Sequence, residues 1–355
     1  MTWSFHPYTI PLARPYSWAK GVQTVRRGLL VSCTIDGATG WGEVAPAPHL
    51  DVDPSEIANF ARKSLRVALA QEDVPAALDA ANCGPRLRCG LAGAWLDAQA
   101  RLAGRSLAAF IAQRVGLPAA AERVPVNALI PIQEPAACAE EAVRAVAAGF
   151  RTLKLKSDGD IDRDVARLEA VQAAVGKGVA LRLDANESYA ATTALSHLRR
   201  LEPFALEYVE QPVPAVERST LVEMLHESPV PIALDESATS WQAVAPLVGF
   251  HPVAILKPQR LGGVDRAADF IAHARDARLR CVVTNSLETA VGRAHALHAA
   301  ALLPEPLPAC GLATEGFLAR DVSRFEVKDG WLALPPGPGL GVAPEMEASL
   351  AAAVE

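Results

Sequence analysis

The sequence predicts an α/β protein built around a parallel barrel of strand–helix units. The first observation is a repeated unit between about residues 123 and 310, in which a short apolar strand ending in a polar residue precedes an alanine-rich helix. The second is its period, because successive strand ends recur at roughly 22–28 residues, the length of one such unit. The third is that most of these strands end in an ionisable residue. In a parallel barrel such ends converge on the face that carries the active site.

Residues 1–122 have a different pattern and are expected to form a separate capping unit. Strand-like stretches come first, "TVRRGLLVSCTIDG" and "GWGEVAP". Helical patterns follow in "DPSEIANFARKSLRVALA" and "LRCGLAGAWLDAQARLAGRSLAAFIAQRVG". After residue 315 the sequence returns to turns and strands, in "FEVKDGWLALPPGPGLGVAP". We expect this tail, residues 316–355, to complete the N-terminal part.

The barrel itself is expected over residues 123–315. A weak eighth strand is expected near "LPACGL". The seven clearer strands are, in order, "VPVNALI", "TLKLK", "ALRLD", "LEYVE", "PIALD", "VAILK" and "CVVTN".

Composition narrows the class of protein. Half of the 355 residues are hydrophobic, and a net charge of −6 is spread without a basic stripe, which argues against a nucleic-acid partner. The six cysteines are scattered without a CxxC pair, as expected for reduced thiols in a cytoplasmic protein. No apolar run is long enough for a membrane span, and the N-terminus lacks a secretory signal pattern. Oligomeric state is left open, with a homo-oligomer as one possibility.

Three acids end three consecutive strands: Asp184, Glu210 and Asp235. A single acid at a strand end is usually a helix cap or a loop residue. Three converging carboxylates without a partner would repel each other and raise one another's pKa. A hard divalent cation removes this conflict, because Mg²⁺ prefers oxygen ligands and keeps positions open for substrate. The pattern therefore predicts a metal site, with Mn²⁺ as an alternative ion.

Lysines end the strands on either side of these acids. Lys154 and Lys156 share one face of their strand, and Lys257 comes from a strand across the barrel. A lysine acts as a base only when its pKa is lowered, and a neighbouring ammonium or metal ion has that effect. We therefore predict Lys156 as the base, with Lys154 beside it and Lys257 opposite. Lysines that reach to solvent are the alternative, which suits Lys154 better than the other two.

These motifs in this order resemble the enolase superfamily, muconate-lactonising subgroup. The matching stretches are "KLK" at 154–156, "LDAN" at 183–186, "VEQP" at 209–212, "LDES" at 234–237 and "LKPQRLGG" at 256–263. The resemblance covers nearly the whole chain and implies a modified TIM barrel, (β/α)7β, with an α+β capping domain. It implies that Asp184, Glu210 and Asp235 bind Mg²⁺, that Lys156 abstracts a proton to give an enediolate, and that Lys257 lies opposite.

Within the subgroup, "VVTNSLETAVGRAHALHAAALLP" most resembles o-succinylbenzoate synthases, with Ser286, Glu288, Thr289 and Gly292 matching S-x-E-[ST]-x-x-G. Dipeptide epimerases usually have a DxD pair near the eighth strand, where this chain has "CGLATEG". N-succinylamino acid racemases use the same residues, so sequence does not separate the two reactions. Muconate cycloisomerases and a catalytically inactive barrel are further alternatives. For a dehydration, Lys156 is expected to return its proton to the leaving hydroxyl while Lys257 stays cationic.

Further residues are predicted to support the site, and most of them also have a plausible structural role. Arg182 shares the inward face of its strand with Asp184, and it either binds a substrate carboxylate or forms a structural ion pair. Asn186 and Glu236 flank ligand residues, either supporting the site or starting helices. Ser286 is expected to hold the succinyl carboxylate or to cap a helix, and Glu288 of the same motif is expected to bind substrate or to support the site. Residues 15–28, "PYSWAKGVQTVRRG", resemble the family's specificity loop, with an ordinary β-hairpin as the alternative.

Overall fold

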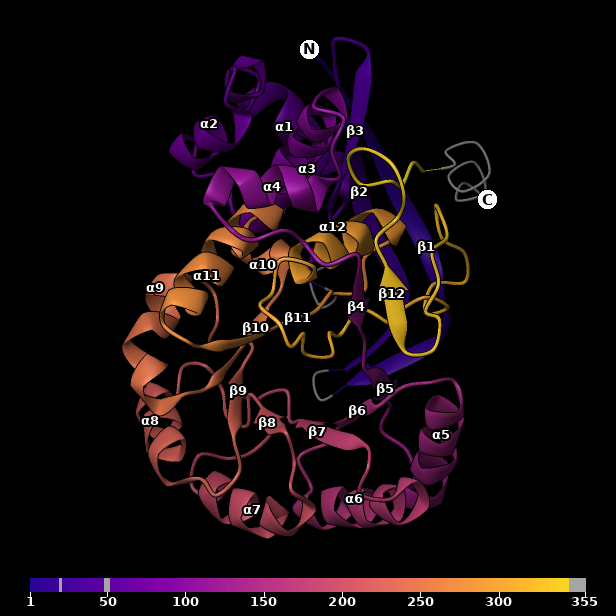
Figure 1. Cartoon of the computed structure of the whole chain (residues 1–355), viewed down its shortest axis with the longest axis vertical. Coiled ribbons are helices and arrows are strands. Elements are labelled where there is room, and N and C mark those ends of the chain that lie inside the picture. Colours follow the sequence, from indigo (N-terminus) through magenta and orange to yellow (C-terminus); the bar gives the residue numbers. More distant parts are fainter. Residues whose placement is uncertain (19–20, 48–51, 345–355) are drawn as a thin grey trace.

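The computed structural model describes residues 1–18, 21–47 and 52–344 (Figure 1). Its centre is a parallel sheet of seven strands in the order β11-β10-β9-β8-β7-β6-β5, so that neighbours in the sheet are neighbours in sequence. This is the order of a barrel made of successive strand–helix units. The strands are β5 Ala128–Ile130, β6 Thr152–Lys156, β7 Ala180–Asp184, β8 Tyr208–Glu210, β9 Ile232–Leu234, β10 Val253–Leu256 and β11 Arg280–Val283.

The barrel is closed by two residues of the weak eighth strand. Cys310 forms a parallel bridge with Val126, and Gly311 forms one with Thr284. The amide of Cys310 donates to the carbonyl of Pro125 at 2.8 Å, and the amide of Gly311 donates to that of Val283 at 2.9 Å. The residues near "LPACGL" therefore join the first and last strands, which gives the predicted (β/α)7β barrel.

Helices connect the barrel strands and cover the outside of the sheet (Figure 1). They are α5 Pro135–Ala147, α6 Ile161–Val175, α7 Ala194–Leu201, α8 Arg218–Glu227, α9 Trp241–Val244, α10 Pro258–Leu261, α11 Val264–Asp276 and α12 Ala290–Ala300. Short 3₁₀ turns extend two of these connections, at Glu202–Phe204 and Ala245–Phe250. Every residue of α12 is buried, because this helix lies between the barrel and the N-terminal part.

The N-terminal part consists of an antiparallel sheet and helices. The sheet contains β1 Thr2–Trp18, β2 Gly21–Ile35 and β3 Ala38–Val44 in that order. The helices are α1 Pro54–Ser64, α2 Val74–Ala80, α3 Pro85–Leu102 and α4 Leu107–Val115, with a 3₁₀ turn at Ala68–Ala70. Strand β3 lies directly on α3, since a Cβ on Gly42 would be 2.0 Å from the carbonyl oxygen of Gly90. Only glycine permits this approach of two backbones.

The C-terminal tail contacts both the N-terminal part and the start of the predicted barrel region. Its strand β12, Trp331–Ala333, pairs with β4, Arg123–Pro125, so the predicted strand "VPVNALI" is divided between two sheets. Further along the tail, Gly339 bridges Ser106 beside α4. Residues 345–355 of the predicted tail lie outside the described residues, and the domain boundaries at 122 and 315 stay predictions.

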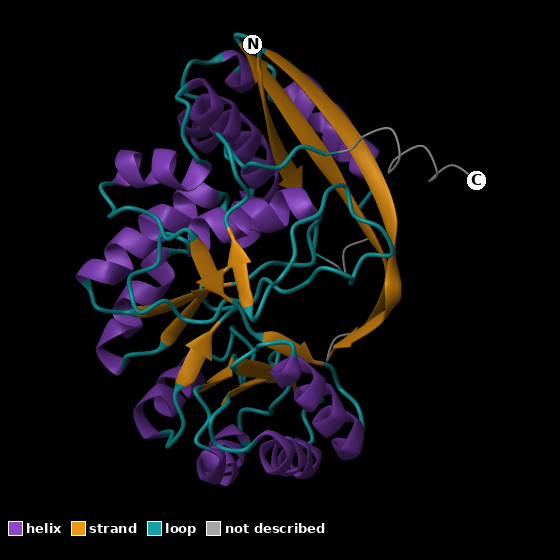
Figure 2. Cartoon of the chain, turned by 45° about the vertical axis from the view of Figure 1, so that its right-hand side comes forward, coloured by secondary structure: helices purple, strands orange, loops and turns teal. Residues whose placement is uncertain are grey.

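The segment predicted as a specificity loop or a hairpin belongs to the long antiparallel pair β1–β2 (Figure 2). Tyr16 pairs with Gln23 and Trp18 with Gly21. Residues 19 and 20 between the strands lie outside the described residues. Across the described ranges, no helix combines the length and apolar character needed to cross a bilayer.

Candidate active site

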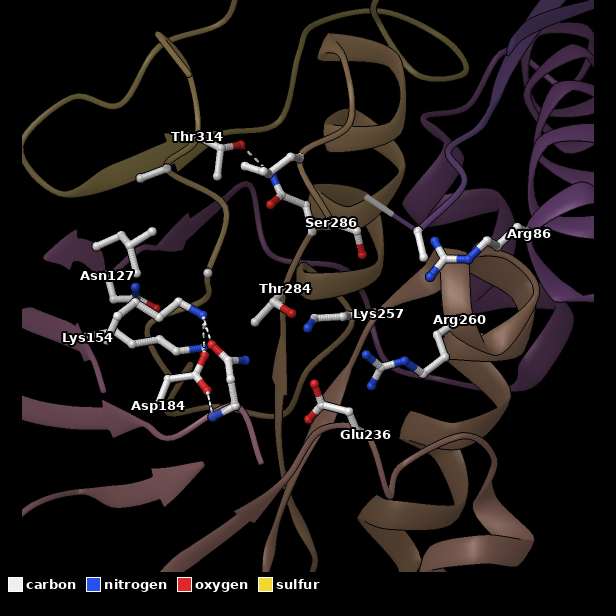
Figure 3. A pocket seen from close by; sticks show the side chains of 18 residues that line it. Arg86, Asn127, Lys154, Asp184, Glu236, Lys257, Arg260, Thr284, Ser286 and Thr314 are labelled. Carbon is white, nitrogen blue, oxygen red and sulfur yellow. Dashed lines mark hydrogen bonds and ion pairs between the residues drawn. The ribbon is translucent and has the colours of Figure 1, made fainter. Parts of the chain in front are cut away.

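A cavity of about 350 Å³ lies at the C-terminal ends of the barrel strands (Figure 3). Residues from most of the barrel connections surround it, and two come from the N-terminal part. Its lining consists of Ala47, Arg86, Asn127, Leu129, Lys154, Lys156, Asp184, Asn186, Glu236, Lys257, Arg260, Thr284, Asn285, Ser286, Leu287, Gly311, Ala313 and Thr314. Seven of the predicted catalytic, metal-binding or supporting residues therefore border the cavity: Lys154, Lys156, Asp184, Asn186, Glu236, Lys257 and Ser286.

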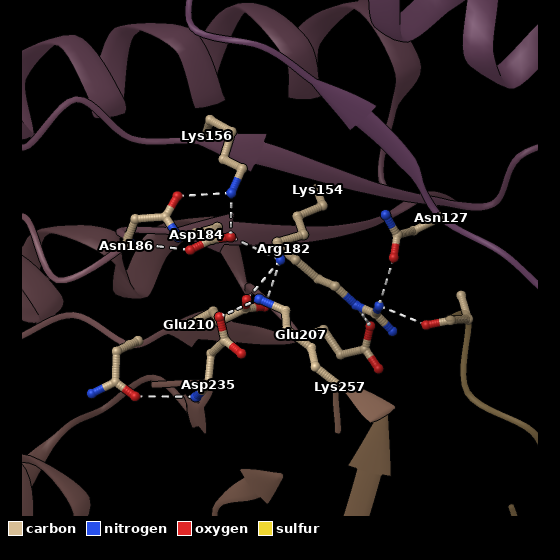
Figure 4. A network of polar contacts seen from close by, with 12 residues as sticks. Asn127, Lys154, Lys156, Arg182, Asp184, Asn186, Glu207, Glu210, Asp235 and Lys257 are labelled. Carbon is tan, nitrogen blue, oxygen red and sulfur yellow. Dashed lines mark hydrogen bonds and ion pairs between the residues drawn. The ribbon is translucent and has the colours of Figure 1, made fainter. Parts of the chain in front are cut away.

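Lys154 and Lys156 emerge on the same face of β6, as strand alternation requires (Figure 4). The amine of Lys156 donates to Asp184 Oδ2 and to Asn186 Oδ1, both at 2.7 Å. The amine of Lys154 lies 2.8 Å from Asp184 Oδ2 and 2.7 Å from Glu210. Burial favours the neutral amine of Lys154, but the two carboxylates outweigh it and raise its pKa well above the ordinary lysine value. Lys154 therefore joins the acids of two neighbouring strands.

The third acid has its own pair of cations across the barrel. Lys257 Nζ lies 2.5 Å from Asp235 Oδ2, and Arg260 Nη1 lies 2.7 Å from Asp235 Oδ1. Burial alone would raise the pKa of Asp235, but the two cations outweigh burial and lower it to about 2. The carboxylate is 0% exposed, so it is buried beneath the cavity floor and not at an open mouth.

Negative charge nevertheless remains crowded at this end of the cavity. Burial and the adjacent Asp184 charge raise the pKa of Glu210 to about 7. Burial and the adjacent Asp235 charge raise the pKa of Glu236 to about 7, and its buried Oε2 has no hydrogen-bond partner. The lysines therefore neutralise only part of this acid cluster.

The acids fit a hard divalent cation by the chemistry of their donor atoms. Carboxylate oxygens are the preferred ligands of Mg²⁺. Among the described residues, no group of three acid, histidine or cysteine side chains lies close enough together to hold a metal ion. The amine of Lys154 lies between the carboxylates of Asp184 and Glu210. The predicted metal-binding roles of Asp184, Glu210 and Asp235 thus stay predictions, supported by the acid charge that the lysines leave uncompensated.

Left-handed backbone conformations occur where the chain leaves the strands. Asn186 has φ 45°, Gln211 has φ 39° and Leu287 has φ 61°. Side chains other than glycine rarely adopt such conformations, and they concentrate at functional sites. Gln211 is held by its side chain, whose Oε1 accepts from the amides of Asp235 and Ser237. The turn after β8 therefore fixes the start of the turn after β9.

Arg182 and Glu288 are not part of the cavity lining. Arg182 Nε donates to Glu207 Oε2 at 2.8 Å, and its Nη1 donates to Ala309 O at 2.7 Å (Figure 4). The structural ion pair is thus the arrangement found, and substrate binding by Arg182 is not supported. Glu288 Oε2 accepts from the amide of Ser286 at 2.5 Å, so it shapes the loop that presents Ser286.

Several lining residues were not predicted. Arg260 follows Lys257 by one helical turn, and this spacing was a usable indication that both side chains face the same site. Arg86 lies in the first turn of α3 in the N-terminal part, and no strand pattern indicates its position. Asn127, Thr284 and Thr314 add neutral polar groups around the cavity.

Comparisons with known proteins agree with this architecture. Residues 137–348 match the family described as enolase C-terminal domain-like. The chain is 36% identical over 324 residues to an o-succinylbenzoate synthase from Thermobifida fusca (strain YX), covering 89% of this chain and 81% of that protein. It is 32% identical over 351 residues to an N-succinylamino acid racemase from an Amycolatopsis species, covering 94% and 92%.

Solved structures share the fold. One is a dipeptide epimerase from Cytophaga hutchinsonii complexed with Mg and the dipeptide D-Ala-L-Val. It superposes with a TM-score of 0.87 at 24% identity, covering 98% of this chain and 96% of that one. The conclusion follows from the family match, from the relatives, and from the barrel with its strand-end lysines and acids. The chain belongs to the enolase superfamily.

Proposed function

We propose that the protein is a Mg²⁺-dependent o-succinylbenzoate synthase, a carbon–oxygen lyase. Its substrate would be 2-succinyl-6-hydroxy-2,4-cyclohexadiene-1-carboxylate, which it dehydrates through an enediolate in menaquinone biosynthesis. We further propose that it works in the cytoplasm and that Mn²⁺ can replace Mg²⁺.

The observation that carries this proposal is the pair of lysines on opposite walls of one cavity. Lys156 ends β6 and Lys257 follows β10, which are the second and sixth strands of the eight-stranded barrel. A substrate between them meets one amine on each side. Lys156 removes the α-proton as the base. The resulting ammonium is on the same side as the proton it removed, and it returns the proton to the hydroxyl that leaves as water.

The acids beside these lysines would hold the metal ion. Asp184, Glu210 and Asp235 supply carboxylate oxygens from three neighbouring strands. A Mg²⁺ ion held by these acids would supply positive charge that stabilises the negative charge developing on the substrate. Lys257 stays cationic and stabilises the same charge from the opposite wall. Asn186 orients Lys156 by accepting a hydrogen bond from its amine.

The choice of reaction within the subgroup rests on sequence similarity. The Thermobifida relative and the S-x-E-[ST]-x-x-G match at 286–292 favour the synthase. The racemase remains a second candidate because the Amycolatopsis relative is 32% identical over nearly the whole chain. A racemase uses the same two lysines, one as base and the other as acid.

The test is a comparison of two substrates with purified protein and Mg²⁺. The synthase proposal predicts rapid loss of the cyclohexadiene carboxylate and formation of o-succinylbenzoate. With a succinylamino acid in D₂O, a two-base racemase would exchange the α-proton of both enantiomers, and Lys257→Ala would leave exchange for one enantiomer only. Efficient two-sided racemisation with little dehydration would reject the synthase in favour of the racemase.

A further inference from the structure

Five cationic side chains line the cavity, and four of them are neutralised by acids of the site. Lys154 and Lys156 contact Asp184, while Lys257 and Arg260 contact Asp235. The fifth is Arg86. Within residues 1–18, 21–47 and 52–344, no carboxylate forms an ion pair with it. A guanidinium in a cavity wall without an acidic partner is costly unless a ligand supplies the negative charge.

The surroundings of Arg86 explain why it stays in place without an acid. Its Nη1 donates to the carbonyl of Ala45 at 2.6 Å, which fixes the side chain between α3 and the segment after β3. Burial lowers the pKa of Arg86, the nearby Glu288 carboxylate raises it, and the cations Arg26 and Arg260 lower it further. Glu288 forms no ion pair with Arg86, and its Oε2 accepts from the amide of Ser286. Arg86 is therefore the cation of the cavity lining that has no acid paired with it among the described residues.

Arg86 lies away from Lys154 and Asp184 at the reacting end of the cavity. In Figure 3, Arg86 and Arg260 lie on one side of the cavity, and Lys154 and Asp184 lie on the other. Ser286 also borders the cavity and adds a hydroxyl. A ligand whose acidic group reacts beside the lysines would extend its far end toward Arg86. A planar guanidinium fork matches a carboxylate in geometry as well as in charge.

We infer that Arg86 binds the distal carboxylate of a dicarboxylate substrate and selects substrates by that group. This inference rests on the proposed function, in which the distal group is the succinyl carboxylate. It also deepens that proposal, because it assigns this group to a residue of the N-terminal part. The same role would apply to a succinylamino acid, whose succinyl group ends in the same carboxylate.

The experiment measures binding, so it does not depend on turnover. The affinity of o-succinylbenzoate is compared by calorimetry, in the presence of Mg²⁺, with that of its analogue whose succinyl carboxylate is a primary amide. The proteins are the wild type, Arg86→Gln, Arg86→Lys, and Arg275→Gln on the exposed face of α11, which removes the same charge away from the cavity.

Arg86→Gln removes one charged hydrogen-bonded contact. We therefore expect it to weaken binding of o-succinylbenzoate by about 10- to 100-fold and binding of the amide analogue by less than about 3-fold. Arg86→Lys should recover part of the loss, and Arg275→Gln should behave as wild type. Equal loss for both ligands in Arg86→Gln would show a merely structural role and overturn the inference. A wild type that binds both ligands equally, or neither, would overturn it as well. Selective loss of acid binding in a protein that does not dehydrate the cyclohexadiene carboxylate would reject the proposed function and leave the inference standing.

Discussion

The Glu43 carboxylate joins the N-terminal part to the barrel, and its removal should weaken the whole fold. Glu43 lies in β3 and is 1% exposed. Its two oxygens accept from Tyr8 Oη at 2.5 Å, from the amide and hydroxyl of Thr289, and from the amide of Gly292 at 2.9 Å. Thr289 and Gly292 belong to the N-terminal end of α12, where backbone amides attract negative charge. The carboxylate therefore satisfies four buried donors from two parts of the chain.

Glu43→Gln keeps the size of the side chain but replaces one acceptor oxygen by an amino group that faces donors. About two buried donors then lose their acceptor, at about 1–3 kcal/mol each, so we expect a loss of about 3 kcal/mol in unfolding free energy. An unfolding entropy of about 2.1 cal/mol/K per residue over 355 residues gives about 0.75 kcal/mol/K, so the melting temperature should fall by about 4 °C.

Thermal unfolding followed by calorimetry measures this change. The matched control is Glu169→Gln, on the exposed face of α6, which should alter stability by less than about 0.5 kcal/mol. A Glu43→Gln variant that melts within about 1 °C of the wild type, or no lower than the control, would refute the reasoning that this carboxylate joins the two parts.

Two further predictions concern the acid cluster and a buried histidine. Asp235→Asn keeps the shape of the side chain but removes a proposed ligand, so Mg²⁺ titration should show weakened binding. Its activity should fall below about a tenth of wild type, a barrier increase above about 1.4 kcal/mol, and greater residual activity would exclude Asp235 from the metal site. Burial lowers the pKa of His298 from its ordinary value of 6.5 to about 4. The unfolded chain therefore binds a proton more readily than the folded protein, so folding stability is lost as the pH falls from 6.5 toward 4. The wild type should lose about 3 kcal/mol more than His298→Asn between pH 7 and 4, and parallel pH profiles would contradict this assignment.

The barrel and the residues at its strand ends were predictable because strand geometry is regular. Parallel strands align their C-terminal ends, so Lys156, Asp184 and Glu210 could be placed together from spacing alone. The same strand geometry explains why Arg182 forms a structural ion pair, the second of its two predicted roles. Arg182 shares the inward face with Asp184, but two strand residues correspond to about 6.6 Å, which places it in a deeper layer. There it meets Glu207 and does not reach the cavity.

Residues outside the strands could not be placed by such arguments. Glu288 was predicted to bind substrate or to support the site, and it lies outside the cavity lining with its Oε2 accepting from the amide of Ser286. Leu287 between them has a left-handed backbone, a local reversal of the ordinary conformation. No periodicity in the sequence indicates this reversal. Arg86 reaches the cavity only because α3 packs against β3 and the barrel. That contact depends on the tertiary arrangement of the two parts of the chain.

The most direct test of the account is the turnover of 2-succinyl-6-hydroxy-2,4-cyclohexadiene-1-carboxylate by Lys156→Ala in the presence of Mg²⁺. Asp184 would keep Lys154 as a partner, so the variant should remain folded with a melting temperature close to that of the wild type. Because Lys154, the other lysine of β6, is held between Asp184 and Glu210, it should not replace the base, and we expect a loss of about 10⁴-fold or more in kcat. A folded variant that keeps more than about 1% of wild-type turnover, a barrier increase below about 2.7 kcal/mol, would show that Lys156 is not the base.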